Sequence, residues 1–545
     1  MKKYIFSKVK RLAVVCLCLL FAVNLLFGCN KKAEDEKVQI IDDNYRNYYE
    51  IYVHSFYDSD GDGIGDLNGV TAKLDYLTEL GINGIWLMPI MPSPTYHKYD
   101  VIDYKDIDPE YGTMEDFDKL VEECHKRGIN IIIDMVMNHS SSQNQWFIEA
   151  CDYLKNLDDG KEPDESECPY VSYYNFSKEK KNDSWYSVAG CDWYYEGVFW
   201  SEMPDLNLEN ENLRKEFEDI SDFWIEHGID GYRMDAAMHY EDDDQNSTIE
   251  IMNWIYNYCL TKKSDFYMVS EVWANKATIK SFYKSMTPSM FNFPASGAEG
   301  TIEKAARGQT GADSLVNALI DYETTYSSVN PEYIDAPFLT NHDQVRVANN
   351  LNNDENDLKM AAGILLTMSG SPFIYYGEEI GMNSKGKDDP NKRLPMNWSA
   401  SDTEGICDIP EGADNNVAQA FPSVDEQLQD ELSLLSYYKR ALKMRNSIPE
   451  LARGTITKEE NLCDGVVAAI RKTWTREDEN GSSVSSEIIV IYNTTDDAAV
   501  IDLSSDEYKD LQIAGYLTLD NTQISIKDGH LEMPGQSICV LKFDE

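Results

Sequence analysis

The sequence has few basic residues for its length, and this shortage excludes one large class of partner. Lys and Arg together number 48 among 545 residues, against 96 Asp and Glu, so the formal net charge at pH 7 is -48. A protein that binds nucleic acid needs clustered cations to neutralise the phosphate backbone. We therefore expect no nucleic-acid partner. The same acidic excess does not hinder an uncharged ligand, and its main physical effect is solubility.

Long apolar runs are also scarce. The run at 12–27 has about 16 residues, which is short of the ~20 needed to span a bilayer as a helix. Residues 1–28 contain five basic side chains and no acidic one. A basic start followed by a short apolar run is typical of a cleaved export signal.

The end of this segment reads Leu26-Phe27-Gly28-Cys29, which resembles the lipobox of bacterial lipoproteins. The resemblance implies that 1–28 is a lipoprotein signal peptide and that Cys29 becomes the lipid-bearing first residue of the mature chain. The polar stretch 29–44 then predicts a tether. We expect a cell-surface protein that meets the membrane only through a lipid anchor at Cys29, with a secreted protein as the alternative.

Cysteine is sparse and irregularly spaced. No CxxC pair or Cys/His spacing indicates a zinc site. Of the 11 cysteines, eight lie beyond Cys29. Three of these, Cys151, Cys168 and Cys191, are close in the sequence, and a disulfide among them is left open because pairing cannot be deduced from sequence.

From residue 48 onward, short β-branched runs alternate with longer amphipathic stretches, and there are no repeats or long low-complexity tracts. This order is typical of parallel strands connected by helices. The candidate strands are 48–56, 82–89, 129–137, 229–236, 266–273, 288–295, 334–341 and 371–377. The candidate helices are 114–127, 211–227, 248–261, 358–369 and 426–446. Eight strands that alternate with helices predict an α/β protein, a (β/α)8 TIM barrel.

Two parts of the chain depart from this alternation. The connection 140–207, after the third strand, is too long for an ordinary βα loop and predicts an inserted domain. After Pro449, strands alternate with turns, which predicts a C-terminal antiparallel β-sandwich. The expected division is a barrel of 45–139 and 208–450, an inserted domain of 140–207 and a sandwich of 451–545.

Polar side chains stand at the carboxyl ends of several candidate strands, where the reacting groups of such barrels lie. Any one of them could be a structural polar residue, but their presence at successive strand ends predicts an active site on one rim. They are Asp134 and His139 after the third strand, Arg233 and Asp235 in the fourth, Glu271 in the fifth, and His342 and Asp343 after the seventh.

Four short segments carry a resemblance to a known family. DMVMNH (134–139), GYRMDAAMH (231–239), SEVW (270–273) and FLTNHD (338–343) resemble the four regions that mark the α-amylase family of glycoside hydrolases. The resemblance covers nearly all of residues 44–545, including the long third loop, which the family calls domain B, and the terminal sandwich. It implies retaining cleavage of α-glucans, in which a carboxylate nucleophile and a carboxylic acid act on the same glycosidic bond.

The resemblance implies roles for three carboxylates. Asp235 matches the nucleophile, Glu271 the general acid/base, and Asp343 the carboxylate that holds the sugar's 2-OH and 3-OH. Arg233 lies two residues before Asp235, on the same face of a strand, and can keep that carboxylate ionised. Glu271 must instead be protonated near neutral pH, which crowding by the other carboxylates promotes.

Further residues are implied to bind the sugar. His139 and His342 match imidazoles that hydrogen-bond its hydroxyls, and Tyr99 matches the aromatic ring beneath it. The other candidates are Arg233, Arg346 and Arg393. The histidines without such support, which we expect to be structural or exposed, are His54, His97, His125, His227 and His530.

The segment DSDGDGIGD (58–66) predicts a calcium site. Asp58, Asp60, Asp62 and Asp66 alternate as in a calcium loop, with glycines that permit a tight turn. An EF-hand would also need a Glu further on and two flanking helices, which are missing. The segment instead resembles the first-loop Ca2+ site of several α-amylase relatives, in which the backbone oxygen of Ile64 also binds; a solvated acidic turn is the alternative. A second family site, left open, would use Asn138, Asp205 and the carbonyl of His239.

MPDLN (203–207) resembles the subgroup intermediate between oligo-1,6-glucosidases and neopullulanases. Ala236 stands where 1,6-specific relatives usually have valine, and Tyr96 where pocket-closing exo-glucosidases usually have aspartate. These two positions favour an endo-acting α-1,4-glucan hydrolase, an α-amylase, on starch and maltooligosaccharides. Met238 replaces a lysine of many α-amylases near the first leaving-group subsite, so the balance of hydrolysis and transglycosylation stays open.

Three alternatives remain at this point. One is a 4-α-glucanotransferase, and another is an activity like that of neopullulanase or oligo-1,6-glucosidase. The third is a non-enzymatic starch-binding surface protein, although such relatives typically lose one or more of the three carboxylates. The sequence does not indicate an oligomeric state.

Overall fold

The structure is a computed structural model that describes residues 43–158, 160–242, 244–477 and 480–543. The expected signal peptide, Cys29 and nearly all of the tether lie outside the described residues. Within the described ranges, no helix combines the length and the apolar character needed to cross a membrane.

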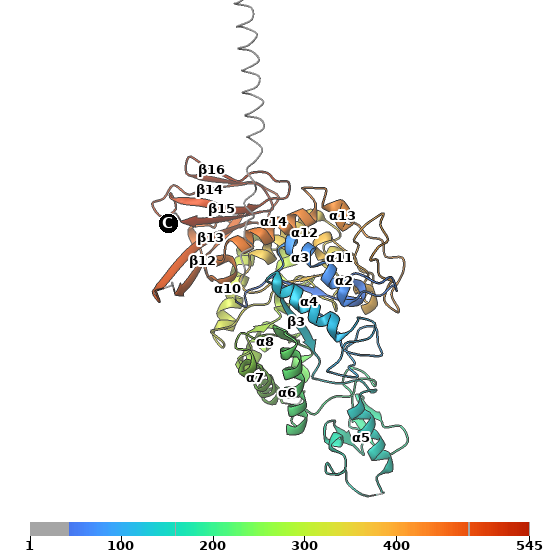
Figure 1. Ribbon diagram of the computed structural model, residues 1–545. Coiled ribbons are helices and arrows are strands. Elements are labelled where there is room, and N and C mark those ends of the chain that lie inside the picture. The colour runs from blue at the N-terminus through green and yellow to red at the C-terminus, as the bar shows by residue number, and fades with distance from the viewer. Residues whose placement is uncertain (1–42, 159, 243, 478–479, 544–545) are drawn as a thin grey trace, which may run out of the picture. The chain divides into compact units, whose positions relative to one another are not determined.

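A parallel sheet of seven strands forms the centre of the fold (Figure 1). Its strand order is β10-β1-β2-β3-β7-β8-β9. The strands are β1 (Tyr48–Ile51), β2 (Gly84–Leu87), β3 (Asn130–Met135), β7 (Gly231–Met234), β8 (Tyr267–Ser270), β9 (Ser289–Met290) and β10 (Phe373–Tyr375). Between the edge strands, Phe291 pairs in parallel with Ala336 and Phe338 with Phe373. These two bridges close the sheet, and the predicted (β/α)8 barrel is confirmed.

The predicted seventh strand, 334–341, is reduced to these two isolated bridges. Pro337 lies between the bridging residues. Because proline has no N–H to donate to a ladder, it interrupts a continuous strand at this point.

The barrel strands are buried on both faces, as is usual for a parallel sheet covered by helices. Every residue of β1, β2, β7 and β8 is buried. Three polar side chains within this sheet, Glu50, Asp134 and Arg233, are at most 1% exposed. Since a buried charge is costly unless it is paired, these three residues must find partners at the barrel rim.

The helices follow the predicted alternation. They are α2 (Leu67–Ala72), α3 (Leu74–Leu80), α4 (Met114–Lys126), α5 (Gln145–Asn156), α6 (Glu211–Glu226), α7 (Gln245–Lys262), α8 (Lys276–Phe282), α9 (Thr301–Ala306), α10 (Ala312–Ser327), α11 (Val347–Asn350), α12 (Glu355–Thr367), α13 (Val424–Gln427), α14 (Leu434–Ser447) and α15 (Glu450–Arg453). The start of α4 shows why the chain becomes helical there: Thr113 and Asp116 form a capping box that satisfies free backbone N–H groups.

The prediction of one helix over 426–446 was wrong in its first half. The chain forms the short α13 and then the longer α14, with a break at 428–433. Ser433 ends the break because its hydroxyl accepts a hydrogen bond from Ser436 N and so caps α14.

The long third connection has its own secondary structure. It contains α5, a 3-10 helix (Pro169–Ser172) and an antiparallel sheet of β4 (Phe176–Ser177), β6 (Tyr194–Glu196) and β5 (Trp185–Ser187). One bridge, His139 with Asp205, attaches its return to the segment after β3, and a second, Tyr174 with Leu206, lies within the connection itself. Its buried side chains are continuous with the barrel core, and the boundaries of an inserted domain stay a prediction. All eight cysteines in the described ranges are free thiols, so the disulfide left open above is not formed.

Two antiparallel sheets follow the barrel. One has the order β11-β12-β13-β18-β15 and the other β14-β17-β16. Their strands are β11 (Thr455–Lys458), β12 (Val467–Glu477), β13 (Ser483–Asn493), β14 (Ala499–Asp502), β15 (Leu511–Leu517), β16 (Ser525–Lys527), β17 (His530–Met533) and β18 (Ser537–Phe543). A separate apolar core that includes Ile489, Ile491, Leu531 and Leu541 is built from both sheets, which confirms the predicted sandwich.

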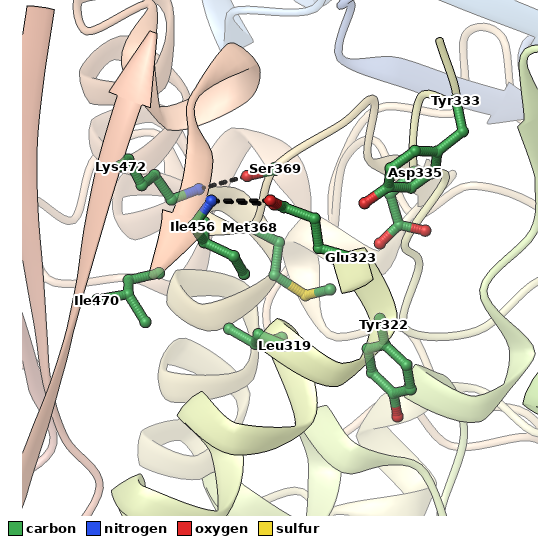
Figure 2. A pocket seen from close by; sticks show the side chains of 10 residues that line it. All are labelled: Leu319, Tyr322, Glu323, Tyr333, Asp335, Met368, Ser369, Ile456, Ile470 and Lys472. Carbon is green, nitrogen blue, oxygen red and sulfur yellow. Dashed lines mark hydrogen bonds between the residues drawn. The ribbon is translucent and has the colours of Figure 1, made fainter. Parts of the chain in front are cut away.

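Polar contacts fasten the first sandwich sheet to the barrel (Figure 2). The carboxylate of Glu323, on α10, accepts a hydrogen bond from Ile456 N at 3.0 Å. The buried amine of Lys472 donates to Ser369 Oγ at 3.0 Å and to Leu451 O at 2.7 Å. The cavity between them is about 20 Å³, room for about one water molecule, so this junction is too closely packed to hold a ligand.

Candidate active site

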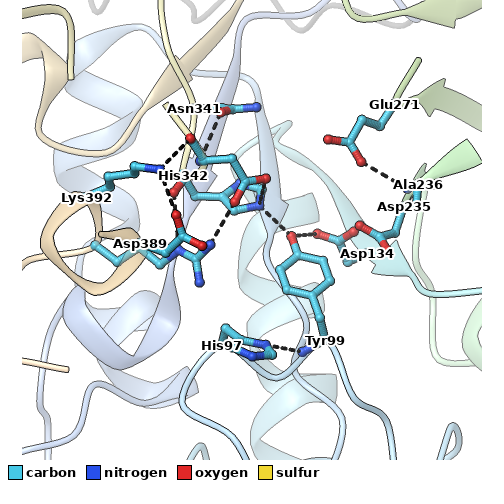
Figure 3. A network of polar contacts seen from close by, with 12 residues as sticks. His97, Tyr99, Asp134, Asp235, Ala236, Glu271, Asn341, His342, Asp389 and Lys392 are labelled. Atoms are coloured by element: carbon cyan, nitrogen blue, oxygen red, sulfur yellow. Dashed lines mark hydrogen bonds and ion pairs between the residues drawn. The ribbon is translucent and has the colours of Figure 1, made fainter. Parts of the chain in front are cut away.

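A cavity of about 410 Å³ lies at the carboxyl ends of the barrel strands. Its lining comes from the segments that follow several different strands, the arrangement expected of a barrel active site. The lining residues are His97, Tyr99, His139, Phe199, Met203, Asp235, Ala236, Glu271, Trp273, Asp343, Asp389 and Arg393. Figure 3 shows most of the polar members together with Asp134, Asn341, His342 and Lys392.

A single guanidinium lies under this cavity and contacts three carboxylates. Arg233 Nη1 is 2.6 Å from Asp235 Oδ1 and 2.6 Å from Asp134 Oδ1, while Nη2 is 3.0 Å from Glu271 Oε2. Arg233 itself is 1% exposed. Because two nitrogens of one planar group hold Asp235 and Glu271, the two carboxylates lie within reach of one bound sugar.

The backbone between β7 and the next turn brings these carboxylates into contact. Asp235 directly follows β7, and Asp235 N donates to Met135 O on β3. Ala236 then adopts a left-handed conformation with φ 45°, a strain of about 1–3 kcal/mol for a residue other than glycine. In that conformation Ala236 N donates to Glu271 Oε2 at 3.0 Å.

The third carboxylate is held by cations on two sides. Asp343 Oδ1 is 2.8 Å from Arg393 Nη2, and its Oδ2 is 3.0 Å from His342 Nε2. Asn341 fixes the turn because its side-chain oxygen accepts from Asp343 N at 3.0 Å. Burial alone would raise the pKa of Asp343, but His342 and Arg393 lower it overall, well below the usual range. Asp343 is therefore ionised.

His342 connects this carboxylate to the aromatic ring of the cavity. Its Nε2 is 2.8 Å from Tyr99 Oη, and its ring stacks on Tyr99 with centroids 5.5 Å apart. Tyr99 Oη also donates to Asp134 Oδ2 at 3.2 Å. These contacts fix the orientation of a ring that lines the cavity.

Negative charge exceeds positive charge in this network. Five carboxylates face three cationic groups: Glu50, Asp134, Asp235, Glu271 and Asp343 against Arg233, His342 and Arg393. Burial raises the pKa of Asp235, an effect that Arg233 opposes. Burial also raises the pKa of Glu271, and the charges of Asp235 and Asp343 raise it further. Burial raises the pKa of Asp134 as well, to about 7, so more than one carboxyl of this network, Glu271 among them, can hold a proton.

The predicted site residues fall into two layers. Asp235, Glu271, Asp343, Tyr99 and His139 line the cavity. His139 Nε2 is buried and has no hydrogen-bond partner among the described residues. Burial lowers the pKa of the His139 imidazole to about 4, so it is neutral and available to a ligand hydroxyl.

Arg233 and His342 form the layer beneath, and neither lines the cavity. Each is 1% exposed and contacts carboxylates that do line it. The structure describes their contacts with these carboxylates, and the expectation that they also touch the sugar stays a prediction.

Arg346 was also expected at the sugar, and the structure places it elsewhere. Its side chain is 1% exposed, packs over the ring of Tyr375, and donates to the backbone oxygens of Tyr376 and Lys392. Arg346 therefore supports the segment that carries Arg393. Arg393, the less central candidate, lines the cavity instead.

His97 was expected to be structural or exposed, and the structure places it, half-buried, at the cavity. It lines the cavity, and its Nδ1 accepts a hydrogen bond from Tyr99 N at 3.1 Å (Figure 3). The signal that the sequence offered for His97 was its position, two residues before Tyr99. The sequence reasoning also missed four cavity residues, namely Phe199, Met203, Trp273 and Asp389.

The acidic loop before α2 has the oxygen donors that calcium prefers. Carboxylate oxygens of Asp58, Asp60 and Asp66 lie within 4.8 Å of one another. Asp62 is not in that group, and its carboxylate accepts a hydrogen bond from Ile64 N at 2.7 Å. Gly61 and Gly63 have φ of 87° and 96°, which permits the tight turn. The donor set fits a calcium ion.

At the second candidate calcium position, Asn138 Nδ2 donates to Asp205 Oδ1 at 3.4 Å. Burial raises the pKa of Asp205 to about 7. A second site stays open.

A model of the "Alpha amylase, catalytic domain" matches residues 50–454 of this chain. The chain belongs to the α-amylase family of glycoside hydrolases. Among its relatives, "Alpha-amylase 3" of Dictyoglomus thermophilum is 41% identical over 423 residues, which are 76% of this chain and 80% of that protein. The solved structure of Eubacterium rectale Amy13B superposes with a TM-score of 0.87 at 44% identity, over 93% of this chain and 97% of that one.

Membership of this family identifies the chain as a glycoside hydrolase but leaves the bond it cleaves undecided. The "Oligo-1,6-glucosidase" of Heyndrickxia coagulans is also similar, at 30% identity over 553 residues, 85% of this chain and 93% of that protein. Related proteins of different named activities thus share this barrel, and specificity must be argued from the residues of the cavity.

The three contacts of Arg233 predict a pH-dependent loss of stability when it is removed. In Arg233→Met the buried carboxylates lose their shared cation, and we expect the free energy of unfolding to fall by about 3–5 kcal/mol at pH 8. Without the cation, the pKa values of these carboxyl groups in the folded state rise further above their values in the unfolded state. The folded state then binds more protons than the unfolded state, so the free energy of unfolding falls as pH rises. Urea unfolding at pH 5 and pH 8 measures this difference.

Arg214→Met is the matched control. Arg214 pairs with the exposed Glu250 at 2.7 Å, and such a pair contributes at most about 1 kcal/mol. An equal loss of stability in both variants, or no pH dependence in Arg233→Met, would show that Arg233 does not balance the buried charges.

Proposed function

We propose that the protein is a retaining, endo-acting α-1,4-glucan hydrolase, an α-amylase, that acts on starch and maltooligosaccharides. One observation carries the proposal. Asp235, Glu271 and Asp343 line the same cavity, and the first two contact one guanidinium. Retaining glycosidases need two carboxyl groups about 5–5.5 Å apart, and sharing one guanidinium is compatible with that separation.

In the first step, an oxygen of Asp235 attacks the anomeric carbon. The bond from that carbon to the glycosidic oxygen breaks, and the leaving oxygen takes the proton of Glu271. In the second step, a water molecule attacks the same carbon while Glu271 takes a proton from it, and the bond to Asp235 breaks. The sugar leaves with its original anomeric configuration, and both carboxyl groups return to their starting protonation states.

The surrounding residues support these roles. The short contact with Arg233 favours the ionised form of Asp235, as a nucleophile requires. Glu271 has the longer contact with Arg233, and burial together with the charges of two nearby carboxylates raises its pKa, which suits a general acid. Asp343, ionised between two cations, is placed to hold sugar hydroxyls and to stabilise positive charge that develops on the ring.

The cavity walls favour internal cleavage of α-1,4 chains. Phe199 and Trp273 line the cavity and are each 49% exposed, so they offer open surfaces on which further sugar rings can stack. Ala236 leaves room next to the nucleophile, where 1,6-specific relatives usually have valine. Tyr96, in place of an aspartate, contacts Arg393 at 3.4 Å.

The runner-up activities share the same chemistry. A 4-α-glucanotransferase would use a sugar in place of water in the second step. The named activity of the Heyndrickxia coagulans relative keeps α-1,6 cleavage as another candidate. A purely starch-binding role is disfavoured because all three carboxylates are present and line one cavity.

We predict that Asp235→Asn lowers kcat on maltoheptaose by at least ~10³-fold, since it removes the nucleophile. Asp265→Asn, at an exposed residue, should leave kcat unchanged.

A chromatographic time course on maltoheptaose, starch, pullulan and panose should show internal cleavage of the first two and little action on panose. If Asp235→Asn hydrolysed maltoheptaose at nearly the wild-type rate, Asp235 would not be the nucleophile. If the main products were longer than the substrate, the enzyme would be a transferase.

We also propose that the acidic loop binds Ca2+ through Asp58, Asp60 and Asp66, with Asp62 and the carbonyl of Ile64 completing the site. The loop packs against a later segment, because Asp408 N donates to Gly63 O at 2.7 Å and Asp58 N to Gly405 O at 3.1 Å. An ion here would hold two distant parts of the chain together.

Chelation is then expected to lower the melting temperature, and added Ca2+ to restore it. An ion present at 100–1,000 times its Kd contributes about 2.7–4.1 kcal/mol, and Asp58→Asn should abolish the response. Asp103→Asn, at an exposed acidic residue outside the loop, should keep it. Equal melting temperatures with EDTA and with Ca2+ would favour a solvated acidic turn.

For location, we propose export and anchoring at the cell surface through a lipid on Cys29, on the basis of the N-terminal pattern alone. The native protein should partition into the detergent phase of a Triton X-114 extract, and Cys29→Ser should move it to the aqueous phase. Wild-type protein found unlipidated in the culture fluid would support the secreted alternative.

A further inference from the structure

A buried glutamate on the first barrel strand lies behind the active site without lining it. Glu50 is the third residue of β1, and its side chain is 1% exposed. Its carboxylate Oε1 is 2.5 Å from His342 Nδ1. None of the four family motifs contains Glu50, and the proposed reaction gives it no part.

The partners of His342 fix the number of protons on its ring. Nδ1 faces the carboxylate of Glu50 at 2.5 Å, and Nε2 faces the carboxylate of Asp343 at 3.0 Å. An ionised carboxylate only accepts hydrogen bonds, so both ring nitrogens must carry a hydrogen. The ring is then an imidazolium held between two carboxylates.

We propose that Glu50 is a positioning residue that keeps His342 doubly protonated, so that His342 donates to Asp343 and holds it ionised beneath the bound sugar. This inference rests on the proposed role of Asp343 in binding the sugar. Glu50 acts through His342 and does not touch the substrate.

Charged groups on the other elements around His342 do not replace Glu50. Asp134 on β3 and Asp235 after β7 attract the imidazolium from a greater distance. Tyr99, on the segment after β2, stacks on the ring and hydrogen-bonds Nε2 but not Nδ1. The guanidinium of Arg393 donates to the backbone oxygen of His342 and opposes the charge of its ring. Among the described residues, Glu50 is the one side chain hydrogen-bonded to Nδ1.

The electrostatic balance agrees with this geometry. Burial by itself would lower the pKa of His342, but Asp343 and Glu50 outweigh it and raise the pKa to about 9. A neighbouring opposite charge within about 4–6 Å changes a pKa by about 1–3 units. Loss of the Glu50 charge should therefore lower the pKa of His342 toward neutral pH.

The test is Glu50→Gln, which keeps an acceptor oxygen at Nδ1 and removes the charge. The midpoint of the His342 titration, followed by NMR with 15N-labelled histidine, should fall by about one pH unit or more. The ratio of kcat/KM at pH 8.5 to that at pH 6 should fall at least about five-fold below the wild-type ratio, because the neutral ring donates from only one nitrogen. Glu50→Asp keeps the charge and should restore much of the ratio even if kcat is lower.

Glu379→Gln is the matched control. Glu379 is fully buried, is hydrogen-bonded to Tyr49 Oη at 2.8 Å, and makes no hydrogen bond or ion pair with His342 among the described residues. It should leave the His342 midpoint and the kcat/KM ratio at their wild-type values. A uniform loss of activity at both pH values in Glu50→Gln, with an unmoved midpoint, would show a purely structural role and overturn the proposal.

The wild-type enzyme provides a second measurement that does not depend on any variant folding. A His342 midpoint below pH 7 would overturn the proposal, because the ring would then be neutral during turnover. This NMR measurement does not depend on the proposed function. If Asp343→Asn kept full activity, the proposed role of Asp343 would be wrong, but the His342 titration would still measure the effect of Glu50.

Discussion

The active site depends on one buried guanidinium. Arg233, on β7, contacts carboxylates from β3, from the end of β7 and from the end of β8. A cation taken out of water is stable only when its hydrogen bonds and charge are well matched, and here the barrel supplies the match because neighbouring strands end at the same rim. The same contact brings Asp235 and Glu271 together.

Three carboxylates share one cation, Arg233, so negative charge is in excess. Because of this excess, the carboxyl groups of the site differ in how readily they hold a proton. Asp343 lies between His342 and Arg393 and is strongly ionised. Glu271 has less cationic contact and is crowded by other carboxylates, so it can keep a proton at a pH where an exposed glutamate would not. The polar layer below the cavity, with Glu50 and His342 in it, therefore sets the protonation of the layer that faces the sugar.

Much of this arrangement could be predicted from the sequence, because local patterns decide it. The eight short apolar runs predicted the barrel, and the alternation of strands and turns after Pro449 predicted the sandwich. The polar residues at the ends of several runs predicted the rim on which the site lies. Two errors came from single residues whose local effect outweighs the pattern around them. Pro337 reduced a predicted strand to two bridges, and Ser433 began a helix later than its periodicity suggested.

At the site, contacts between residues distant in the sequence set the limit. Arg346 follows a motif by three positions, yet its guanidinium turns away to backbone oxygens of a segment about 30 to 46 residues later. His97 stands two residues before Tyr99 in the sequence, but only the folded loop shows that it lines the cavity. Glu50 is one polar residue in an apolar strand, and its partner His342 is 292 positions away.

The pairing of Asp235 and Glu271 on one anomeric carbon is tested most directly by trapping the covalent intermediate. In Glu271→Gln, α-glucosyl fluoride should still react, because fluoride leaves without a proton, while the second step is slow for want of a base. Peptide mass spectrometry of the denatured enzyme should then find one hexose on Asp235. A hexose on any other side chain, or an unmodified enzyme that releases β-glucose, would contradict the proposed chemistry.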